Sequence, residues 1–346
     1  MPWTKLLADA QHEQEISYTD TAGDRIITYE QAVTEAIDQS MQLDSNVIVL
    51  GEGVDTAGYI YNTTSSLSEK YGKARVIETP IAESAITGIT LGSAIAGLRP
   101  VLMHMRNDFL LISMDQIVNH IAHWKKIFGG KVPLVIRAII ARGWGSGAQH
   151  SQSFHTLFAG FDGLKVVMPS TPFDVKGMFM AAVASDEPVI FFEHRWLYRD
   201  RGVVPREPYA VSLDKSVLRR EGRDITVVAM SLSNRDAGKT LDDLQKDNIT
   251  ADWIDLRSIN PIDTDRIISS VVKTERLLII ENGPVNCGIG AEIAARLSER
   301  PWNEKKIKIS RLGWAGSTVP AGPKLEEKFY LSPDEIKDAI RKMVRE

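Results

Sequence analysis

The sequence has 346 residues, of which 43% are hydrophobic and 25% charged, a composition typical of a soluble globular protein and a length that excludes a single ordinary core. The formal net charge of -4, with acids and bases interspersed, gives no basic stripe for a phosphate backbone and argues against a nucleic-acid partner. A single cysteine, Cys287, excludes an internal disulfide framework, and no segment approaches the roughly 18 uninterrupted apolar residues of a membrane helix, so we expect a cytoplasmic protein without a membrane anchor.

The first half of the chain alternates between predicted strands and helices, after a polar N-terminal extension over residues 1–26. Apolar residues at helical spacing predict a helix from Thr28 to Met41, with Thr28 and Gln31 in capping-box positions. The same patterns predict, in chain order, strands 46–50 and 75–77, helix 83–96, strand 100–105, helix 109–128, strands 132–140 and 164–168, helix 173–184 and strand 189–193. Apolar strands alternating with helices indicate a mostly parallel sheet covered on both faces, which we assign to residues 27–200.

Residues 201–223 interrupt this alternation, because they are rich in proline, glycine and charge, and we interpret them as a linker. A second alternating set over residues 224–346 predicts a smaller α/β domain. Its expected elements are strand 225–230, helix 235–244, strand 250–255, helix 263–272, strand 276–280, helix 290–297, strand 306–311 and a closing helix that Ser332 and Glu335 cap.

Three polar side chains are candidates for chemistry because they follow predicted strands, and ligands of parallel sheets bind at the carboxyl ends of the strands. Glu83 begins a helix just after Thr79 and Pro80, Glu52 follows the strand 46–50, and His150 follows a glycine-rich loop that suits an active-site segment. Ordinary roles remain open at this point: a carboxylate in a first helical turn complements the helix dipole, and a surface acid or a loop histidine needs no function.

Glycine patterns are less informative. Gly88, Gly92 and Gly97 lie inside a predicted helix and favour close helix packing over phosphate binding. The GxG of NCGIGAE, residues 286–292, is only a weak indication of a dinucleotide site. The motifs GxxxxGK[ST], GxSxG and HExxH do not occur, which argues against a P-loop enzyme, an α/β-hydrolase and a zinc protease.

Taken together, the motifs resemble in order and spacing the β subunits of pyruvate, branched-chain and acetoin dehydrogenase E1 components, in the transketolase-like superfamily. The resemblance rests on VIVLGEGV, RVIETPIAESAITGITLGSAIAGLRPV, DQIVNHIAHWKKIFGG, AQHSQSF, GLKVVMPSTPFDVKGMFMAAV and PVIFFEHRWLY. It covers nearly the whole chain from about residue 27. It implies a parallel-sheet, pyrimidine-type domain that binds thiamine diphosphate, followed by a smaller transketolase C-terminal-type α/β domain.

The resemblance also implies roles for the candidate residues. Glu83 matches the carboxylate that hydrogen-bonds the aminopyrimidine ring of thiamine diphosphate and thereby activates the cofactor for loss of its C2 proton. His150 matches a histidine that guides protons or orients the substrate beside the reacting centre. Glu52 matches an acid of a proton path between paired active sites. Apolar walls of the pyrimidine ring are implied for Ile81, Met105 and Phe109.

The implied partners follow from what this chain lacks. Thiamine enzymes hold Mg²⁺ and the diphosphate with a GDG motif, which does not occur here, so no metal ligand is expected in this chain. The resemblance places that half of the site on an E1 α subunit, in an α2β2 heterotetramer, and in dehydrogenase complexes an E2 lipoyl acyltransferase docks on the C-terminal domain. The substrate would be a small 2-oxo acid.

Two segments depart from the family pattern. His104 and Arg106 stand where mostly apolar residues are usual, so they could bind an anionic or hydroxylated substrate, or they could form a salt bridge with Asp108, which we favour. Ser185 stands where an acid often helps to hold a potassium ion, which makes a K⁺ site doubtful here.

These departures leave two alternatives to an E1 β subunit. The first is a split-gene transketolase-like enzyme that transfers a ketol or acyl unit without an E2 partner. The second is a catalytically silent scaffold, which the presence of Glu83, Phe109 and His150 argues against. The sequence does not identify the 2-oxo acid, the acceptor or the α chain.

Overall fold

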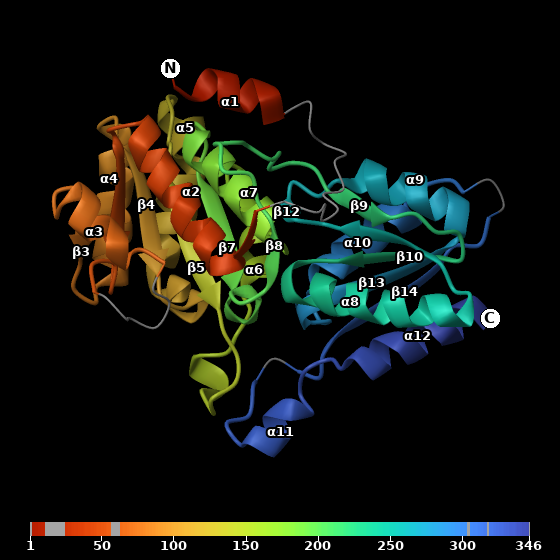
Figure 1. Cartoon of the computed structure of the whole chain (residues 1–346). Helices are drawn as coiled ribbons and strands as arrows, with labels where there is room; N and C mark the ends of the chain where they lie inside the picture. The colour runs from red at the N-terminus through yellow and green to blue at the C-terminus, as the bar shows by residue number, and fades with distance from the viewer. Residues whose placement is uncertain (1, 11–24, 57–62, 303–304, 317, 346) are drawn as a thin grey trace.

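Two parallel-type sheets lie side by side in the computed structural model, which describes residues 2–10, 25–56, 63–302, 305–316 and 318–345 (Figure 1). Seven strands form the first sheet, in the order β12 (Ser258–Asn260), β6 (Lys165–Val167), β7 (Val189–His194), β5 (Val135–Ile140), β4 (Arg99–His104), β2 (Val47–Gly51) and β3 (Val76–Glu78). All neighbours in this sheet are parallel except β12, which pairs antiparallel with β6. The carboxyl ends of β2, β3, β4, β5 and β7 therefore share one edge.

The second sheet has five strands, in the order β14 (Lys308–Trp314), β13 (Arg276–Pro284), β10 (Ile225–Ala229), β11 (Ala251–Asp255) and β9 (Val217–Arg220). Only β9 runs antiparallel to its neighbour. A separate antiparallel pair joins β1 (Ile26–Thr28) to β8 (Arg201–Val203). The segment expected as a linker thus contains the short strands β8 and β9.

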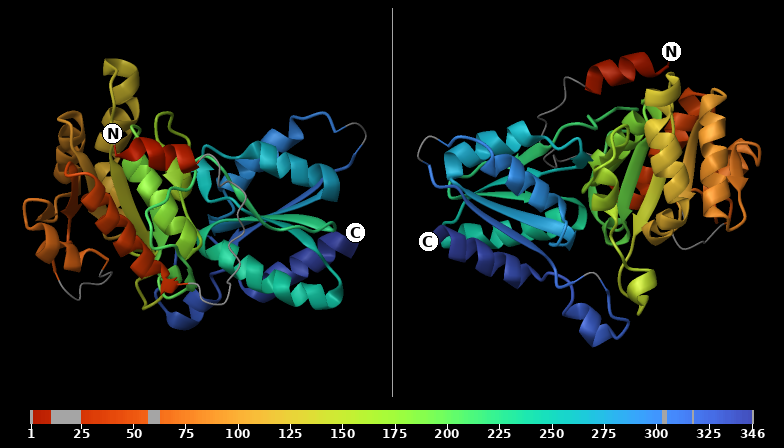
Figure 2. Two further views of the ribbon diagram at one scale, coloured as in Figure 1. Left: turned by 45° about the horizontal axis from the view of Figure 1, so that its top comes forward. Right: turned by 180° about the vertical axis from the view of Figure 1, so that it is seen from behind.

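Helices cover both faces of each sheet, as the alternation of elements predicted (Figure 2). One face of the first sheet packs on α1 (Trp3–Ala10), α2 (Tyr29–Leu43) and α7 (Pro172–Ala184), and the other on α4 (Glu83–Ile95), α5 (Ala122–Phe128) and α6 (His155–Ala159). The second sheet lies between α8 (Ser231–Leu244) with α12 (Pro333–Arg345) and α9 (Thr264–Thr274) with α10 (Ile289–Ser298). Short helices α3 (Ser65–Tyr71) and α11 (Pro323–Glu327) lie outside these layers.

Two predicted helix caps are confirmed. The Thr28 hydroxyl accepts the Gln31 N–H at 3.2 Å while the Gln31 side chain accepts the Thr28 N–H at 2.9 Å. Ser332 and Glu335 make the same reciprocal pair at 3.3 and 2.8 Å. Each cap satisfies backbone donors that the helix itself leaves without a partner, which is why the sequence signal is reliable.

The expected single helix over residues 109–128 is wrong. The chain forms a 3-10 helix, η1 (Asn107–Ser113), then a π-helix, η2 (Asp115–Ile121), and only then α5. The Asn107 side chain donates to the carbonyl of Gln152 at 2.8 Å and accepts the N–H of Phe154 at 2.8 Å. These tertiary bonds fix the chain directly after β4 in a tighter turn than an α-helix provides.

Other expectations also need correction. Helix α8 begins at Ser231, four residues earlier than predicted, and Ser233 in its first turn donates to the carbonyl of Glu281 at 2.8 Å. A Cβ at Gly92 would meet nothing within 4 Å, and one at Gly88 only Gln116 at 3.9 Å, so the expected close helix packing does not occur within the described chain.

Part of the expected N-terminal extension is folded. Trp3 of α1 is only 3% exposed, and its indole N–H donates to Asp44 at 2.9 Å. Residues 11–24 of the extension lie outside the described residues.

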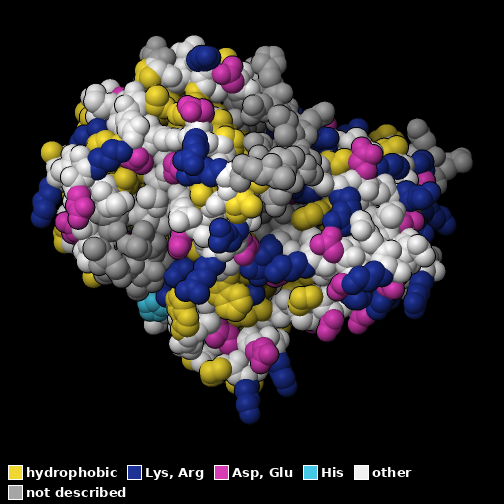
Figure 3. Space-filling model, viewed as in Figure 1, with side chains coloured by type: hydrophobic (Ala, Val, Ile, Leu, Met, Phe, Trp, Pro, Cys, Tyr) yellow, Lys and Arg dark blue, Asp and Glu magenta, His cyan; other side chains and the backbone are white. Residues whose placement is uncertain are grey.

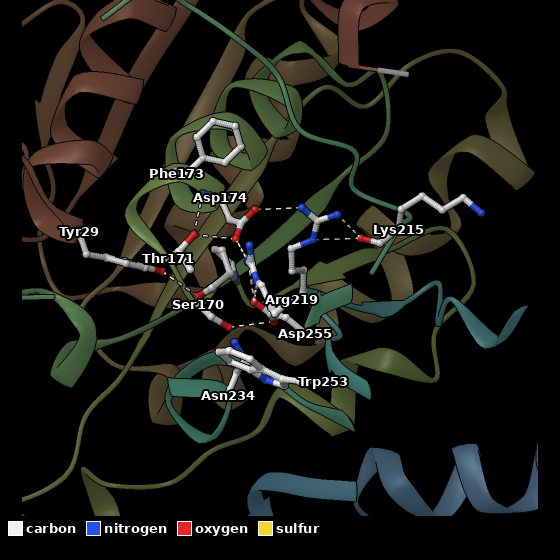
Figure 4. A network of polar contacts seen from close by, with 12 residues as sticks. Tyr29, Ser170, Thr171, Phe173, Asp174, Lys215, Arg219, Asn234, Trp253 and Asp255 are labelled. Atoms are coloured by element: carbon white, nitrogen blue, oxygen red, sulfur yellow. Dashed lines mark hydrogen bonds and ion pairs between the residues drawn. The ribbon is translucent and has the colours of Figure 1, made fainter. Parts of the chain in front are cut away.

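Two aspartates and two arginines connect the sheets through a buried network (Figure 4). Asp174, in the first turn of α7, accepts hydrogen bonds from Arg219 of β9 and, at 2.9 Å, from Arg257, which follows β11. Arg219 also donates to Asp255 of β11 at 2.8 Å. Burial alone would raise the pKa of Asp174, but the charges of Arg219 and Arg257 outweigh it and lower that pKa. The aspartate is therefore ionised at neutral pH.

We expect Asp174→Ala to lower the free energy of unfolding by about 3–5 kcal/mol, because it removes the carboxylate that binds both Arg219 and Arg257 and leaves Asp255 as the only carboxylate of the network. Asp162→Ala, which removes the exposed ion pair with Lys126, is the control and should leave the free energy of unfolding close to that of the wild type. Urea denaturation followed by circular dichroism measures both. Equal, small losses would show that the network does not stabilise the fold.

Candidate active site

The candidate residues lie after successive strands of the first sheet, at the shared carboxyl edge. Glu52 follows β2, Glu83 opens α4 after β3, and Phe109 lies in η1 after β4. His150 follows β5 at the end of a loop whose last turn is the short 3-10 helix η3 (Gly147–Gln149). Parallel pairing brings these segments together although up to 98 positions separate them in the sequence.

Two carboxylates lie near each other at this edge. Glu83 is 9% exposed, and its neighbour Glu52 is half-buried. Burial raises the pKa of Glu52, and the negative charges of Glu83 and Glu78 raise it further. The edge therefore has an excess of negative charge and can hold a proton more readily than isolated carboxylates can.

His150 lies against Phe109 and is fixed by its backbone. The two rings make an edge-to-face contact with centroids 5.4 Å apart. The Arg106 guanidinium donates to the carbonyl oxygen of His150, and the Gln152 N–H donates to Asp108 at 3.1 Å. Three consecutive side chains, Arg106 to Asp108, thus bind the backbone of the His150 segment.

These contacts correct the expected salt bridge between Arg106 and Asp108, which is not among the ion pairs of the described residues. Burial raises the pKa of Asp108 to about 6, although the Gln152 N–H and the charge of Arg106 oppose the shift. Nothing in the residue pattern signalled that Arg106 binds a backbone 44 positions away. A guanidinium engaged with a backbone carbonyl is also poorly placed to bind a substrate anion.

The structure also does not support the alternative that His104 binds the substrate. The side chain is 4% exposed, and its Nε2 lies 3.4 Å from the Thr87 hydroxyl. Burial lowers the pKa of His104 to about 4, so the imidazole is neutral near pH 7. A neutral, buried ring carries no charge with which to bind an anion.

The apolar candidates differ in their surroundings. Met105 is half-buried and packs against the hydrophobic core beneath α2 and α7, whereas Ile81 is 79% exposed. In the turn before Glu83, the Thr79 hydroxyl is buried and makes no hydrogen bond within the described residues. A carboxylate, an open apolar side chain and an unpartnered hydroxyl suit a ring that carries both polar atoms and an apolar face.

The segment considered for potassium already binds a cation of the protein itself. Arg99, at the start of β4, donates to the carbonyls of Val183 and Ser185 and to the carboxylate of Asp186, each at 2.9 Å. A K⁺ ion would need these oxygens as ligands, but they already bind the Arg99 guanidinium. The residues present therefore do not fit a potassium site.

The weak nucleotide motif is also explained by an internal contact. The N–H of Gly290 at the start of α10 donates to the buried carboxylate of Glu281 at 2.6 Å, where a bound phosphate would have to lie.

Among the described residues, no cluster of three or more His, Cys, Asp or Glu is arranged to hold a metal ion. None of the described helices is long and apolar enough to cross a membrane.

Comparison with known proteins agrees with this geometry. The transketolase pyrimidine-binding domain model matches residues 25–201, and the transketolase C-terminal domain model matches residues 214–336. A solved structure entitled "Split gene transketolase, inactive beta4 tetramer" has a TM-score of 0.74 and 22% identity, covering 92% of this chain and 98% of that one. The fold and the edge of the first sheet thus define a transketolase-type protein with a pyrimidine-binding domain.

Relatives of higher identity narrow the class. The chain is 37% identical over 324 residues to the 2-oxoisovalerate dehydrogenase subunit beta of Bacillus subtilis, covering 92% of this chain and 98% of that protein. It is 35% identical to the acetoin:2,6-dichlorophenolindophenol oxidoreductase subunit beta (90% and 95% covered) and 34% identical to the pyruvate dehydrogenase E1 component subunit beta (92% and 98% covered), both of the same organism. The chain belongs to the family of these E1-type β subunits.

The depressed pKa of His104 predicts a pH dependence of stability. The folded pKa of about 4 lies below the unfolded value of 6.5, so the unfolded state binds more protons between these values and is favoured as the pH falls. We expect His104→Gln to remove up to about 3 kcal/mol of the stability loss between pH 6.5 and pH 4. Thermal or urea unfolding across this range measures the difference between the wild type and the variant.

The exposed His120 supplies the control, because its side chain is 54% exposed. His120→Gln, measured over the same pH range, controls for the loss of one histidine. A His104→Gln profile that runs parallel to that of the wild type would contradict the prediction.

Proposed function

We propose that this chain is the β subunit of a thiamine-diphosphate-dependent E1 enzyme that decarboxylates a 2-oxo acid and passes the acyl group to a lipoyl or other acceptor. The observation that carries the proposal is the position of Glu83, buried in the first turn of α4 beside Glu52, within a pyrimidine-binding domain. The named relatives act on pyruvate, 2-oxoisovalerate or acetoin, and the particular substrate is left to experiment.

The residues of this chain would hold the aminopyrimidine half of the cofactor. Glu83 would hydrogen-bond a ring nitrogen, and Ile81, Met105 and Phe109 would contact the apolar faces of the ring. When bound, thiamine diphosphate supplies an acidic C–H and an electron sink for the decarboxylation. His150 would donate or accept a proton near the substrate, since Phe109 and Arg106 fix its position. Glu52 would share protons with Glu83, consistent with its raised pKa.

The Mg²⁺ and diphosphate would be held by a partner α chain in an α2β2 heterotetramer. An exposed apolar face beside the site supports such a partner: Ile81, Ile89, Leu111 and Ile112 are between 41% and 79% exposed. The open Gly88 and Gly92 of α4 would allow a second helix to approach closely. A cytoplasmic location, and an E2 lipoyl acyltransferase on the C-terminal domain, complete the proposal.

The test is co-expression of this chain with its genomic neighbour, followed by a screen of 2-oxo acids for carbon dioxide release with thiamine diphosphate, Mg²⁺ and an artificial electron acceptor. Turnover of pyruvate or a branched-chain 2-oxo acid would establish the E1 function and identify the substrate. A stable complex that binds the cofactor but turns over no 2-oxo acid would favour the ketol or acyl transferase instead.

We predict that the chain without a partner binds thiamine diphosphate at least about 100-fold more weakly than the assembled enzyme, because the contacts to the diphosphate are missing. Isothermal titration calorimetry with and without Mg²⁺ measures this difference. Tight, Mg²⁺-dependent binding by the single chain would contradict the assignment of the metal to a partner.

Replacement of Glu83 by Gln should abolish exchange of the cofactor C2 proton in the assembled enzyme, because the amide cannot take up or share the proton that activates the ring. Exchange into deuterium oxide, followed by proton NMR, reports this step separately from turnover. Glu69→Gln, on the exposed face of α3, is a matched control and should exchange at the wild-type rate. Unchanged exchange in Glu83→Gln would remove Glu83 from its assigned role.

A further inference from the structure

The loop that carries His150 is irregular and depends on external contacts for its shape. Gly143, Trp144, Gly145 and Gly147 all have positive φ, at 89°, 64°, 67° and 63°. Glycine loses more conformational entropy than other residues when it is ordered, so a segment of this kind does not hold one conformation by itself. Its position must be set by the elements packed around it.

The C-terminal domain supplies the first of these contacts. Glu326 of α11 is 5% exposed, and its Oε1 accepts the N–H of Gly143 at 2.6 Å, across 183 positions of sequence. The same oxygen accepts the hydroxyl of Tyr330 at 3.0 Å, which holds the carboxylate in place. Figure 1 shows α11 beside the end of the loop after β5, at the lower edge of the molecule.

Aromatic and backbone contacts also hold the neighbouring residues of the loop. The Arg142 guanidinium lies 4.6 Å from the ring of Trp196 and 4.3 Å from that of Tyr330, between the two domains. The Trp196 indole N–H donates to the carbonyl of Arg142 at 3.0 Å. A Cβ at Gly147 would lie 3.3 Å from the Cβ of Ala321, so the loop backbone packs directly on the segment before α11.

The other end of the loop is held by the first domain. Arg106 donates to the carbonyl of His150, and Asp108 accepts the N–H of Gln152, two residues further along the chain. The loop is therefore fixed at Gly143 by the C-terminal domain and at His150 by the segment after β4. Freeing the first of these ends would allow the chain that leads to His150 to move.

We infer that Glu326 is a positioning residue: its carboxylate, held by Tyr330, fixes the glycine-rich loop to the C-terminal domain and so places His150 beside Phe109. Glu326 itself would touch neither the cofactor nor the substrate. The effect on turnover rests on the proposed function of His150, whereas the effect on the loop does not.

The first measurement is hydrogen–deuterium exchange by mass spectrometry on the full chain, in peptides that cover residues 141–152. Glu326→Met keeps the side-chain length but removes the acceptor, so exchange of the loop should rise at least about 10-fold. Glu326→Gln keeps an acceptor oxygen and should stay within about 3-fold of the wild type. Glu327→Met, the exposed neighbour in the same helix, is the matched control and should leave the loop unchanged.

Peptides of β13 report whether a variant has lost stability as a whole and should not change. If Glu326→Met does not fold, Tyr330→Phe carries the test, because it removes only the hydroxyl that holds Glu326. A smaller rise in exchange confined to the loop would support the inference. Loop exchange that equals the wild type in the folded variants would overturn it, whatever the enzyme does.

The second measurement is turnover of the complex with the partner chain. Glu326→Met should lower kcat about 10- to 100-fold with little change in KM, and Glu326→Gln should restore most of the activity. A wild-type complex without turnover, together with the predicted change in exchange, would reject the proposed function and leave the contact intact. Full activity of Glu326→Met in an active complex would overturn the positioning role.

Discussion

The buried network of Asp174, Asp255, Arg219 and Arg257 is the constraint on which the arrangement of the two sheets depends (Figure 4). Asp174, Asp255 and Arg257 are buried away from water, so each of these charges is stable only with its partners in place. One aspartate belongs to α7 of the first sheet, and the other three residues belong to strands or turns of the second sheet. The network thereby selects one relative orientation of the domains out of the many that apolar packing alone would tolerate.

Apolar packing and backbone pairing reinforce that orientation. A single hydrophobic cluster runs from Ile136 of β5 and Phe158 of α6 to Ile254 of β11 and Ile293 of α10. Strand β12, which follows the second sheet's β11 in the chain, pairs with β6 at the edge of the first sheet. Basic side chains also lie between the domains, where Arg201, Arg235 and Lys239 line a cleft of about 430 Å³. Figure 3 shows Lys and Arg side chains gathered in the middle of the face that it draws. Because the orientation is fixed, α11 can reach the loop after β5.

Local signals account for what the sequence predicted well, and contacts distant in sequence account for its errors. Caps such as Thr28 with Gln31 are complete within one helical turn, and the strand-helix alternation reports burial residue by residue, so both were confirmed. The helix expected from Phe109 failed because Asn107 binds a segment 45 to 47 positions away. For the site, the rule that ligands bind at the carboxyl ends of parallel strands correctly predicted that Glu52, Glu83 and His150 lie at one edge. The contacts of Arg99 and Glu326 could not be predicted in this way, because they span 84 and 183 positions and produce no periodic pattern in the sequence.

The electrostatics of the edge support the proposed division of the site between this chain and a partner. Arg106, which follows β4 at this edge, is committed to the backbone carbonyl of His150, so its guanidinium stabilises the position of that segment. Burial and the negative charge of Glu83 are left to raise the pKa of Glu52. A cationic ring, or basic side chains of a second subunit, would relieve that repulsion as they bound. The exposed apolar face around Ile81 and Ile89 lies at the start and along the outside of α4, the helix that carries Glu83. Under the proposed function, association with a partner would bury this face and change the dielectric around the carboxylate in one step, and would thereby couple assembly of the protein to the chemistry of its site.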